Sequence, residues 1–172
     1  RMERALGGRH VGTYAAIKSH SPREDVVAGA NAARAAKADL LVAVGGGSVI
    51  DATKAMQLCL WLGLDSPEAM QPYCAGFDRF KNLAVSMPAD PIRMVSVSTT
   101  LSASEFTENA GITQSATNTK ETFRHRLFAP RIVVLDPAAT LDTPDWLLFC
   151  TGIRAVDHAI ETYCNTRASP AT

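Results

Sequence analysis

The apolar and polar positions of this chain alternate between short buried runs and longer helical stretches. Short apolar runs, each followed by Gly, Pro or polar residues, are typical of buried strands and lie at 40–44, 94–98 and 132–135. Helical patterns lie at 22–37, 49–62 and 146–163. Ser21 and Pro22 predict the start of the first helix as its N-cap and first residue, and Gly152 is expected to break the last helix in two. Because helices and strands succeed one another with short turns, the order favours an α/β fold with a parallel sheet.

Weaker patterns predict smaller elements between these. Residues 11–17 are compatible with a short strand. A proline-rich connecting segment at 63–91 is predicted to hold one short helix around 67–73. The arms of a hairpin are expected near 111–113 and 122–123.

The composition fits a globular protein with a sizeable core. Of the 172 residues, 47% are apolar and 20% are charged. Seventeen basic and seventeen acidic residues cancel, so electrostatics give no case for nucleic acid or an anionic membrane as a partner. The longest apolar run, 58–62, is too short to span a bilayer, and the N-terminus has no signal-peptide layout.

The cysteines point to a reducing compartment. Cys59, Cys74, Cys150 and Cys164 are widely spaced and form no CxxC pair. A chain of this size needs no covalent staples, so neither a disulfide nor a zinc site is indicated. We therefore expect reduced thiols and a cytoplasmic location.

A glycine turn is the strongest local sign of function. Gly45, Gly46, Gly47 and Ser48 stand between the strand at 40–44 and the helix at 49–62. Backbone N–H groups at the start of a helix can hold a phosphate, and glycines let the anion approach the backbone closely. The Ser48 hydroxyl can cap the helix and bond a phosphate oxygen. The alternative is a glycine-rich βα turn that binds nothing.

Residues 45–54 resemble the GGGSxxDxxK segment of the iron-containing alcohol dehydrogenase family, which shares its fold with glycerol dehydrogenase and dehydroquinate synthase. The resemblance implies that the glycine turn holds the pyrophosphate of NAD or NADP and that Asp51 also belongs to the cofactor site. For Asp51 and Lys54 the alternative is an exposed i,i+3 ion pair that stabilises the helix little.

Residues 98–107 resemble the PTTYAGSEMT segment of maleylacetate reductases, a branch of the same family, without a gap. The alcohol dehydrogenases carry a segment one residue longer here. The match implies that Thr99, Thr100 and Ser104 touch the cofactor, and their place directly after a strand suits this, because open α/β sheets bind ligands beyond the carboxyl ends of their strands. The alternative is a solvated Ser/Thr loop.

The same resemblance implies further assignments. Lys120 lies sixteen places before Asp136, the interval of the family's cofactor-ribose lysine, although a lone lysine is commonly solvated surface. The family's fold implies a Rossmann-like nucleotide-binding domain at 1–137 and the beginning of an all-helical domain at 138–172. No strand is found before residue 11, so we expect an internal portion of a longer protein.

Residues 152–161 resemble the family's GMDALxHAxE helix, in which an aspartate and a histidine coordinate the metal. His158 occupies the histidine position, but Arg154 replaces the aspartate. A guanidinium has no lone pair to offer a cation and would repel it. Asp157 points about 100° away from His158 and does not restore the site. Maleylacetate reductases also lack this aspartate, so the resemblance implies that no metal is bound.

These observations favour an NAD(P)H-dependent reductase of a small carboxylated oxo compound that resembles maleylacetate reductase. Arg154 could stabilise a developing alkoxide or bind a substrate carboxylate, and His158 could donate the proton. By analogy with the family, a homodimer is expected. The run 123–126 is basic enough to bind an anionic substrate, or it is a solvated loop.

Three alternatives remain open at this level. Arg154 could form a structural ion pair with Asp157 or Glu161. The protein could be a metal-dependent alcohol dehydrogenase with altered ligands. It could also be a nucleotide-binding relative without catalysis.

Overall fold

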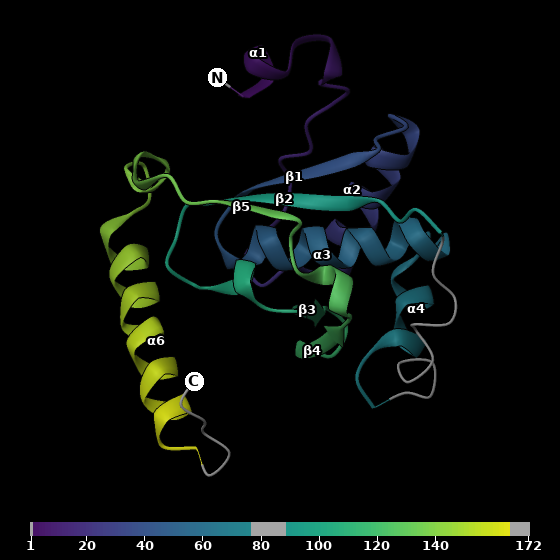
Figure 1. Cartoon of the computed structure of the whole chain (residues 1–172). Coiled ribbons are helices and arrows are strands. Elements are labelled where there is room, and N and C mark those ends of the chain that lie inside the picture. The colour runs from purple at the N-terminus through teal and green to yellow at the C-terminus, as the bar shows by residue number, and fades with distance from the viewer. Residues whose placement is uncertain (1, 77–88, 166–172) are drawn as a thin grey trace.

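The computed structural model describes residues 2–76 and 89–165, which form an α/β body and a long helix beside it (Figure 1). The helices of the body are α1 (Met2–Leu6), α2 (Arg23–Ala35), α3 (Gly47–Leu62) and α4 (Pro67–Met70), and the long helix is α6 (Asp145–Tyr163). The strands are β1 (Leu40–Gly45), β2 (Arg93–Ser98), β3 (Asn109–Gln114), β4 (Thr119–Arg124) and β5 (Ile132–Val134). Short 3₁₀ turns lie at η1 (Gly7–Arg9), η2 (Gln71–Tyr73), η4 (Ser104–Phe106), η5 (Arg126–Phe128) and η6 (Pro137–Thr140).

The central sheet is parallel, with strand order β1-β2-β5. β1 and β2 pair from Leu40 opposite Arg93 to Gly45 opposite Ser98. This register brings the carboxyl ends of both strands to one edge, where the N–H of Thr99 donates to the carbonyl of Gly45 at 3.1 Å. The glycine turn and the segment after β2 are therefore neighbours, as the sequence predicts.

Helix α3 lies between the sheet and the β3–β4 hairpin (Figure 1). Because it is covered on several sides, its sequence is apolar around most of its circumference rather than along one stripe. Its buried apolar residues include Ile50, Ala55, Leu58 and Cys59. α3 is thus the central element of the core, and it begins at the glycine turn.

The other face of the sheet is partly bare. Leu40, Val42 and Val44 of β1 are exposed, whereas Leu41 and Ala43, on the opposite face, are buried in the core. The register puts Ile132 and Val134 of β5 on the same exposed face. The sequence of β1 is apolar at successive positions, which is typical of a parallel strand whose sheet is covered on both faces.

The predicted regular elements are confirmed, with differences at particular positions. Residues 11–17 form no strand; Tyr14 and Ile17 pack on the core from an irregular segment, so their apolar character reflects burial without a strand partner. Gly152 does not break α6, because one glycine costs a helix only about 1 kcal/mol relative to alanine. A Cβ at Gly152 would lie 3.4 Å from Leu101 Cδ1, an ordinary contact distance, so the space at this position does not require glycine.

Two serines have different roles from those predicted. Pro22 is the N-cap of α2, and the Ser21 hydroxyl donates instead to the carbonyl of Ser48 at 2.7 Å. Gly46 is the N-cap of α3, which puts Ser48 inside the first turn. Ser48 therefore does not cap its helix; its Oγ accepts from the N–H of His20 at 3.1 Å. Both serines join the segment before α2 to the start of α3.

The connecting segment and the hairpin follow the prediction where they are described. The short helix around 67–73 is α4 followed by η2, and the hairpin arms are β3 and β4. Residues 77–88 of the connecting segment lie outside the described residues. The cysteine thiols are free, with Cys59 and Cys74 buried and Cys150 and Cys164 exposed.

In the described ranges, 2–76 and 89–165, no helix combines the length and apolarity needed to cross a membrane.

Candidate functional site

The glycine turn lies directly against the segment that follows β2. A Cβ on Gly46 would lie 2.8 Å from Thr100 Cγ2, and one on Gly47 would lie 2.9 Å from Ser102 Oγ. Both distances are shorter than real contacts, so side chains at these two positions would force the segments apart. Glycine fits here because the side chains of Thr100 and Ser102 lie directly against the backbone of the turn at the carboxyl edge of the sheet.

The start of α3 can accept an anion. No side chain caps this end of α3, whose first turn begins at the glycine turn. The leading N–H groups of a helix lack partners inside the helix and attract negative charge. A phosphate at this position would find both donors and a favourable dipole.

Hydroxyl groups without partners surround the same edge. The side-chain oxygens of Ser98, Thr100 and Ser102 are buried and have no hydrogen-bond partner within the described ranges of the chain. A buried polar group left unsatisfied costs about 1–3 kcal/mol, so a ligand that supplied partners to these hydroxyls would be favoured here. The oxygen atoms of a dinucleotide would supply the missing partners. The residues present therefore fit a phosphate-bearing cofactor.

Asp51 and Ser104 are brought together, but they face each other. The Ser104 hydroxyl donates to Asp51 Oδ1 in a very short hydrogen bond. The other carboxylate oxygen, Oδ2, accepts from the N–H of Gly111 at 2.9 Å. Asp51 therefore joins α3 both to the end of the segment after β2 and to β3. In this structure, both oxygens of the Asp51 carboxylate accept hydrogen bonds from the protein itself.

Lys120 reaches the same place from β4. A Cβ on Gly111 would lie 3.1 Å from Lys120 Nζ and 3.5 Å from Asp51 Oδ2. The lysine ammonium thus lies over Gly111 on the side of the hairpin that faces α3. The structure brings Lys120, Asp51 and Ser104 into one neighbourhood, although they are far apart in the sequence.

Lys54 is a buried member of this neighbourhood that the sequence interpretation missed. Its side chain is 0% exposed, so the alternative of an exposed ion pair with Asp51 is wrong: Nζ lies 3.6 Å from Asp51 Oδ1 inside the protein. Burial lowers the pKa of Lys54, and the charge of Asp51 opposes this shift. The available signal was a lysine in a helix that is otherwise apolar on most sides.

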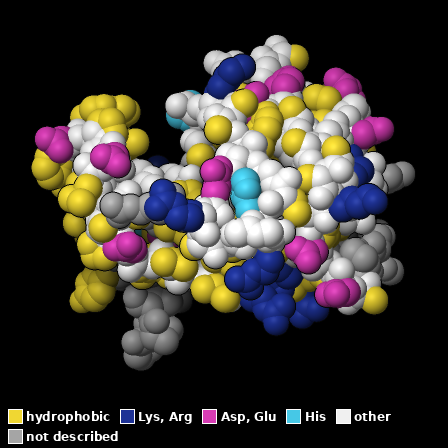
Figure 2. All heavy atoms as spheres, turned by 90° about the horizontal axis from the view of Figure 1, so that it is seen from above, with side chains coloured by type: hydrophobic (Ala, Val, Ile, Leu, Met, Phe, Trp, Pro, Cys, Tyr) yellow, Lys and Arg dark blue, Asp and Glu magenta, His cyan; other side chains and the backbone are white. Residues whose placement is uncertain are grey.

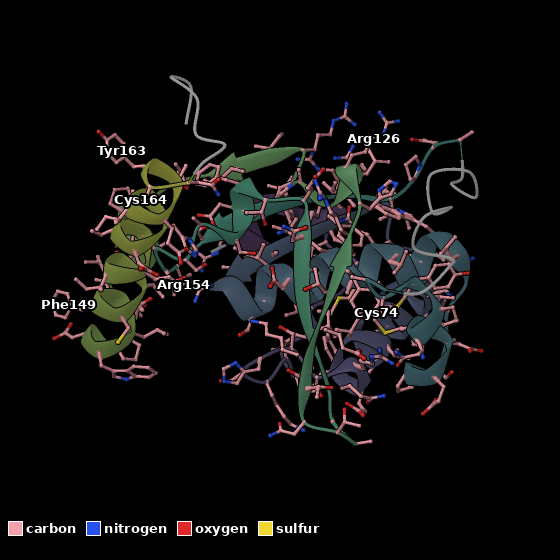
Figure 3. All side chains as sticks on the ribbon, turned by 90° about the horizontal axis from the view of Figure 1, so that it is seen from below. Cys74, Arg126, Phe149, Arg154, Tyr163 and Cys164 are labelled. Atoms are coloured by element: carbon pink, nitrogen blue, oxygen red, sulfur yellow. The ribbon has the colours of Figure 1, made fainter. Side chains whose placement is uncertain are left out.

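Arg154 and His158 lie on α6, on the face that meets the body. The N–H of Leu101 donates to Thr151 Oγ1 at 3.1 Å, which fixes this face of α6 against the segment after β2. Arg154 and His158 follow Thr151 by three and seven positions and share its face. Figure 3 shows Arg154 on the body side of α6, whereas Phe149 and Tyr163 point away.

Within the described ranges, no ion pair or side-chain hydrogen bond engages Arg154 or His158. Arg154 is exposed and His158 is half-buried. Between residues 2–76 and 89–165, no ion pair joins Arg154 to Asp157 or Glu161.

A metal site is not assembled by the described part of the chain. Within it, no three His, Cys, Asp or Glu side chains gather closely enough to hold an ion. Beside His158, the position one turn away carries a guanidinium, which cannot serve as a ligand. The metal-independent chemistry inferred from the sequence stays a prediction.

The basic run 123–126 does not belong to this site. Phe123 is fully buried, and the His125 ring packs against Trp61 with centroids 5.4 Å apart. Arg93, at the start of β2, contributes to the electrostatic environment of His125, so the run lies toward the amino end of the sheet. Figure 3 shows Arg126 far from Arg154.

Comparison with known proteins places this geometry in a family. The profile of the iron-containing alcohol dehydrogenase family matches residues 1–137. The chain is 35% identical over 163 residues to Dehydrogenase ALT3 of Alternaria alternata, covering 93% of this chain and 41% of that protein. It is 31% identical over 156 residues to a maleylacetate reductase of Sphingobium indicum, covering 91% of this chain and 35% of that protein.

A solved structure agrees with the sequence relatives. The maleylacetate reductase of Agrobacterium tumefaciens superposes with a TM-score of 0.74 at 25% identity, over 99% of this chain and 39% of that one. The chain thus spans about two fifths of the length of these relatives. With the glycine turn, the segment after β2 and the parallel sheet in place, this chain belongs to the iron-containing alcohol dehydrogenase family.

Proposed function

We propose that the protein is an NAD(P)H-dependent oxidoreductase that reduces a small carboxylated oxo compound, in the manner of a maleylacetate reductase, without a metal ion. The observation that carries the proposal is the joining of two cofactor segments at one edge. The glycine turn lies against Thr100 and Ser102, whose buried hydroxyls lack partners in the described part of the chain. The cofactor supplies the hydride; the chain supplies its binding site and its surroundings.

The cofactor-binding roles are assigned to the residues at this edge. Gly45, Gly46, Gly47 and Ser48 approach the pyrophosphate, with the start of α3 offering N–H donors. Thr99, Thr100 and Ser104 line the opposite side. Lys120 would hold the ribose, and Asp51 orders the neighbouring segments through its bonds to Ser104 and Gly111.

The substrate roles are assigned to α6. Arg154 carries a permanent charge on the face of α6 that Thr151 turns toward the cofactor edge. A guanidinium there can bind a substrate carboxylate bidentately or stabilise an alkoxide as it forms. His158 on the same face would donate the proton.

Titration of the full-length protein with NADH and NADPH, followed by fluorescence, tests the first half of the proposal. Saturable binding is expected, and a panel of oxo acids should then support turnover that simple aldehydes do not. Binding without turnover of any oxo acid or aldehyde would favour the non-catalytic relative. Absence of nucleotide binding would overturn the proposal.

Metal analysis separates the two enzyme candidates. The purified, active protein should hold no stoichiometric divalent ion, and a chelator should leave its rate unchanged. A bound iron or zinc ion at one per chain, with activity lost on chelation, would favour a metal-dependent alcohol dehydrogenase with altered ligands. The proposal also includes a homodimer in the cytoplasm. Light scattering of the full-length protein would test the homodimer, and cell fractionation would test the location.

A further inference from the structure

We propose that Lys54 is a positioning residue, whose buried ammonium holds the segment from Ser104 to Asn109 on α3 and thereby sets the cofactor segment after β2 against the glycine turn. This inference rests on the proposed function, because it concerns the shape of the same cofactor edge. It assigns a role to a residue for which the sequence suggested only a surface ion pair.

The ammonium is saturated by hydrogen bonds to one short stretch of chain. Lys54 Nζ donates to the carbonyls of Ser104 and Asn109, both at 2.7 Å. It also lies 3.1 Å from Thr107 Oγ1 and 3.3 Å from Ser104 Oγ. The two carbonyls are five residues apart, so a single cation fixes both ends of this stretch to one point of α3.

Asp51 reinforces the same attachment one helical turn earlier. Its carboxylate accepts from the Ser104 hydroxyl and from the N–H of Gly111, and it lies 3.6 Å from Lys54 Nζ. Asp51 and Lys54 together therefore attach residues 104–111 to α3 through side-chain contacts. We call this set of contacts the Asp51–Lys54 clip.

The clip is rigidly connected to the glycine turn. Lys54 follows Gly47 by seven residues in the same helix, a separation of about 10 Å along a stiff axis. Ser104 closes the segment that carries Thr100 and Ser102, the side chains against which the glycines pack. Fixing Ser104 to α3 thus fixes the distance between the two halves of the cofactor edge.

A charged residue serves this purpose better than an apolar one. The three ammonium protons satisfy two carbonyls and a hydroxyl in a place that solvent does not reach. An apolar replacement would remove the ammonium from both carbonyls, which would keep donors within the stretch itself, such as the N–H of Thr107 to the carbonyl of Ser104 at 3.1 Å, but would lose this attachment to α3. Lys54 could instead contribute only to general stability, so the test must separate the shape of the cofactor edge from the stability of the fold.

The test compares Lys54→Met with Gln57→Met in the full-length protein. Gln57 is a matched control because it is also fully buried in α3, about one turn later, and its side-chain nitrogen and oxygen have no partner in the described ranges. The readouts are the Kd for NADH, the midpoint of urea unfolding and hydrogen exchange of residues 99–109. Lys54→Met should raise the Kd about tenfold or more, because a displacement of about 1 Å in a binding group is enough for such losses. Gln57→Met should leave the Kd unchanged.

Two further variants keep the inference testable if Lys54→Met fails to fold. Lys54→Arg retains the charge and several donors, and it should restore affinity and exchange protection in part. Thr107→Val removes one exposed partner of the ammonium and should raise the Kd in the same direction, by a smaller factor.

The outcomes distinguish this inference from the proposed function. If the unaltered protein does not bind NADH, the proposed function fails, while exchange at 99–109 still reports on the clip. If the unaltered protein binds NADH and Lys54→Met binds equally well with unchanged exchange, the positioning role is wrong and the proposed function stands. Equal losses in Lys54→Met and Gln57→Met would also overturn it, because that result is explained by general stability.

Discussion

His125 illustrates how one residue can make stability depend on pH. Its ring lies within 6.0 Å of the rings of both Trp61 and Phe128, and its Nδ1 accepts from the N–H of Leu127 at 3.1 Å. Burial lowers the pKa of His125 below its ordinary value of 6.5, and the charges of nearby arginines lower it further. Nearby Glu108 opposes this shift without reversing it.

The sign of the effect follows from proton linkage. Below pH 6.5, His125 binds a proton in the unfolded chain but stays neutral in the folded chain. The free energy of unfolding therefore falls as the pH falls from 6.5 toward the lower pKa that His125 has in the folded chain. We expect His125→Asn, which keeps an acceptor for Leu127, to flatten this part of the urea stability profile between pH 7.5 and 5. The exposed His20→Asn is the control and should retain the slope. An unaltered slope in His125→Asn would contradict the assignment.

Gly46 gives a second prediction at the residue scale. A Cβ there would lie 2.8 Å from Thr100 Cγ2, so Gly46→Ala must push the segment after β2 away from the glycine turn. We expect a loss of about 1–3 kcal/mol in unfolding free energy, typical of overpacking, together with weaker NADH binding. Gly8→Ala is the control, since no atom lies within 4 Å of its added Cβ. Equal midpoints and affinities for the two variants would show that the contact is not needed.

At the scale of elements, the sequence predicted most of the fold because periodicity reports burial. The parallel strands, α2, α3 and the β3–β4 hairpin each carry their own apolar pattern, and all are observed. The strand predicted at 11–17 is wrong, because Tyr14 packs on the core from a segment that pairs with no strand. An apolar period shows that a residue is buried but not which hydrogen bonds its backbone makes.

The site was predicted less completely for a related reason. The glycine turn and the Thr99–Ser104 segment follow from strand ends, which the sequence does locate. The inward-facing Lys54, the Asp51–Ser104 bond and the approach of Lys120 depend on how the hairpin folds back onto α3. Such contacts join residues about 50 to 70 positions apart, and no local pattern encodes them.

Gly152 provides a test of the continuous helix α6. An alanine there should favour the helix by about 1 kcal/mol, and its Cβ at 3.4 Å from Leu101 Cδ1 requires only a small shift of a flexible side chain. Gly152→Ala should therefore slow hydrogen exchange in α6 about fivefold, with no change in α3. Faster exchange in α6 would mean that Gly152 is needed for a break or for tighter contact with Leu101.

At the scale of the whole molecule, the described chain has two parts, the α/β body and α6, which differ in how many of their residues are buried. α3 contributes ten buried residues to the core, whereas α6 has none. The link between them includes the bonds from Thr143 Oγ1 to the carbonyl of Thr99 and from Leu101 N–H to Thr151 Oγ1. Figure 2 shows apolar side chains gathered at the left of the view, where α6 lies. The exposed apolar residues of this helix include Trp146, Phe149 and Ile153.

This asymmetry predicts a gradient of local stability in the chain of residues 1–172. Amides in the middle of α3 should exchange only through global unfolding, whereas those of α6 should exchange through local opening, which needs far less free energy. Hydrogen exchange with mass spectrometry measures both at once, and Thr151→Val, which removes the acceptor of the Leu101 N–H, should accelerate exchange in α6 alone. Because the apolar side chains of α6 could also be covered by a second copy, the measurement is repeated on dilution. Protection of α6 equal to that of α3 at every concentration would contradict the gradient, while protection that falls on dilution would identify α6 as an interface between copies.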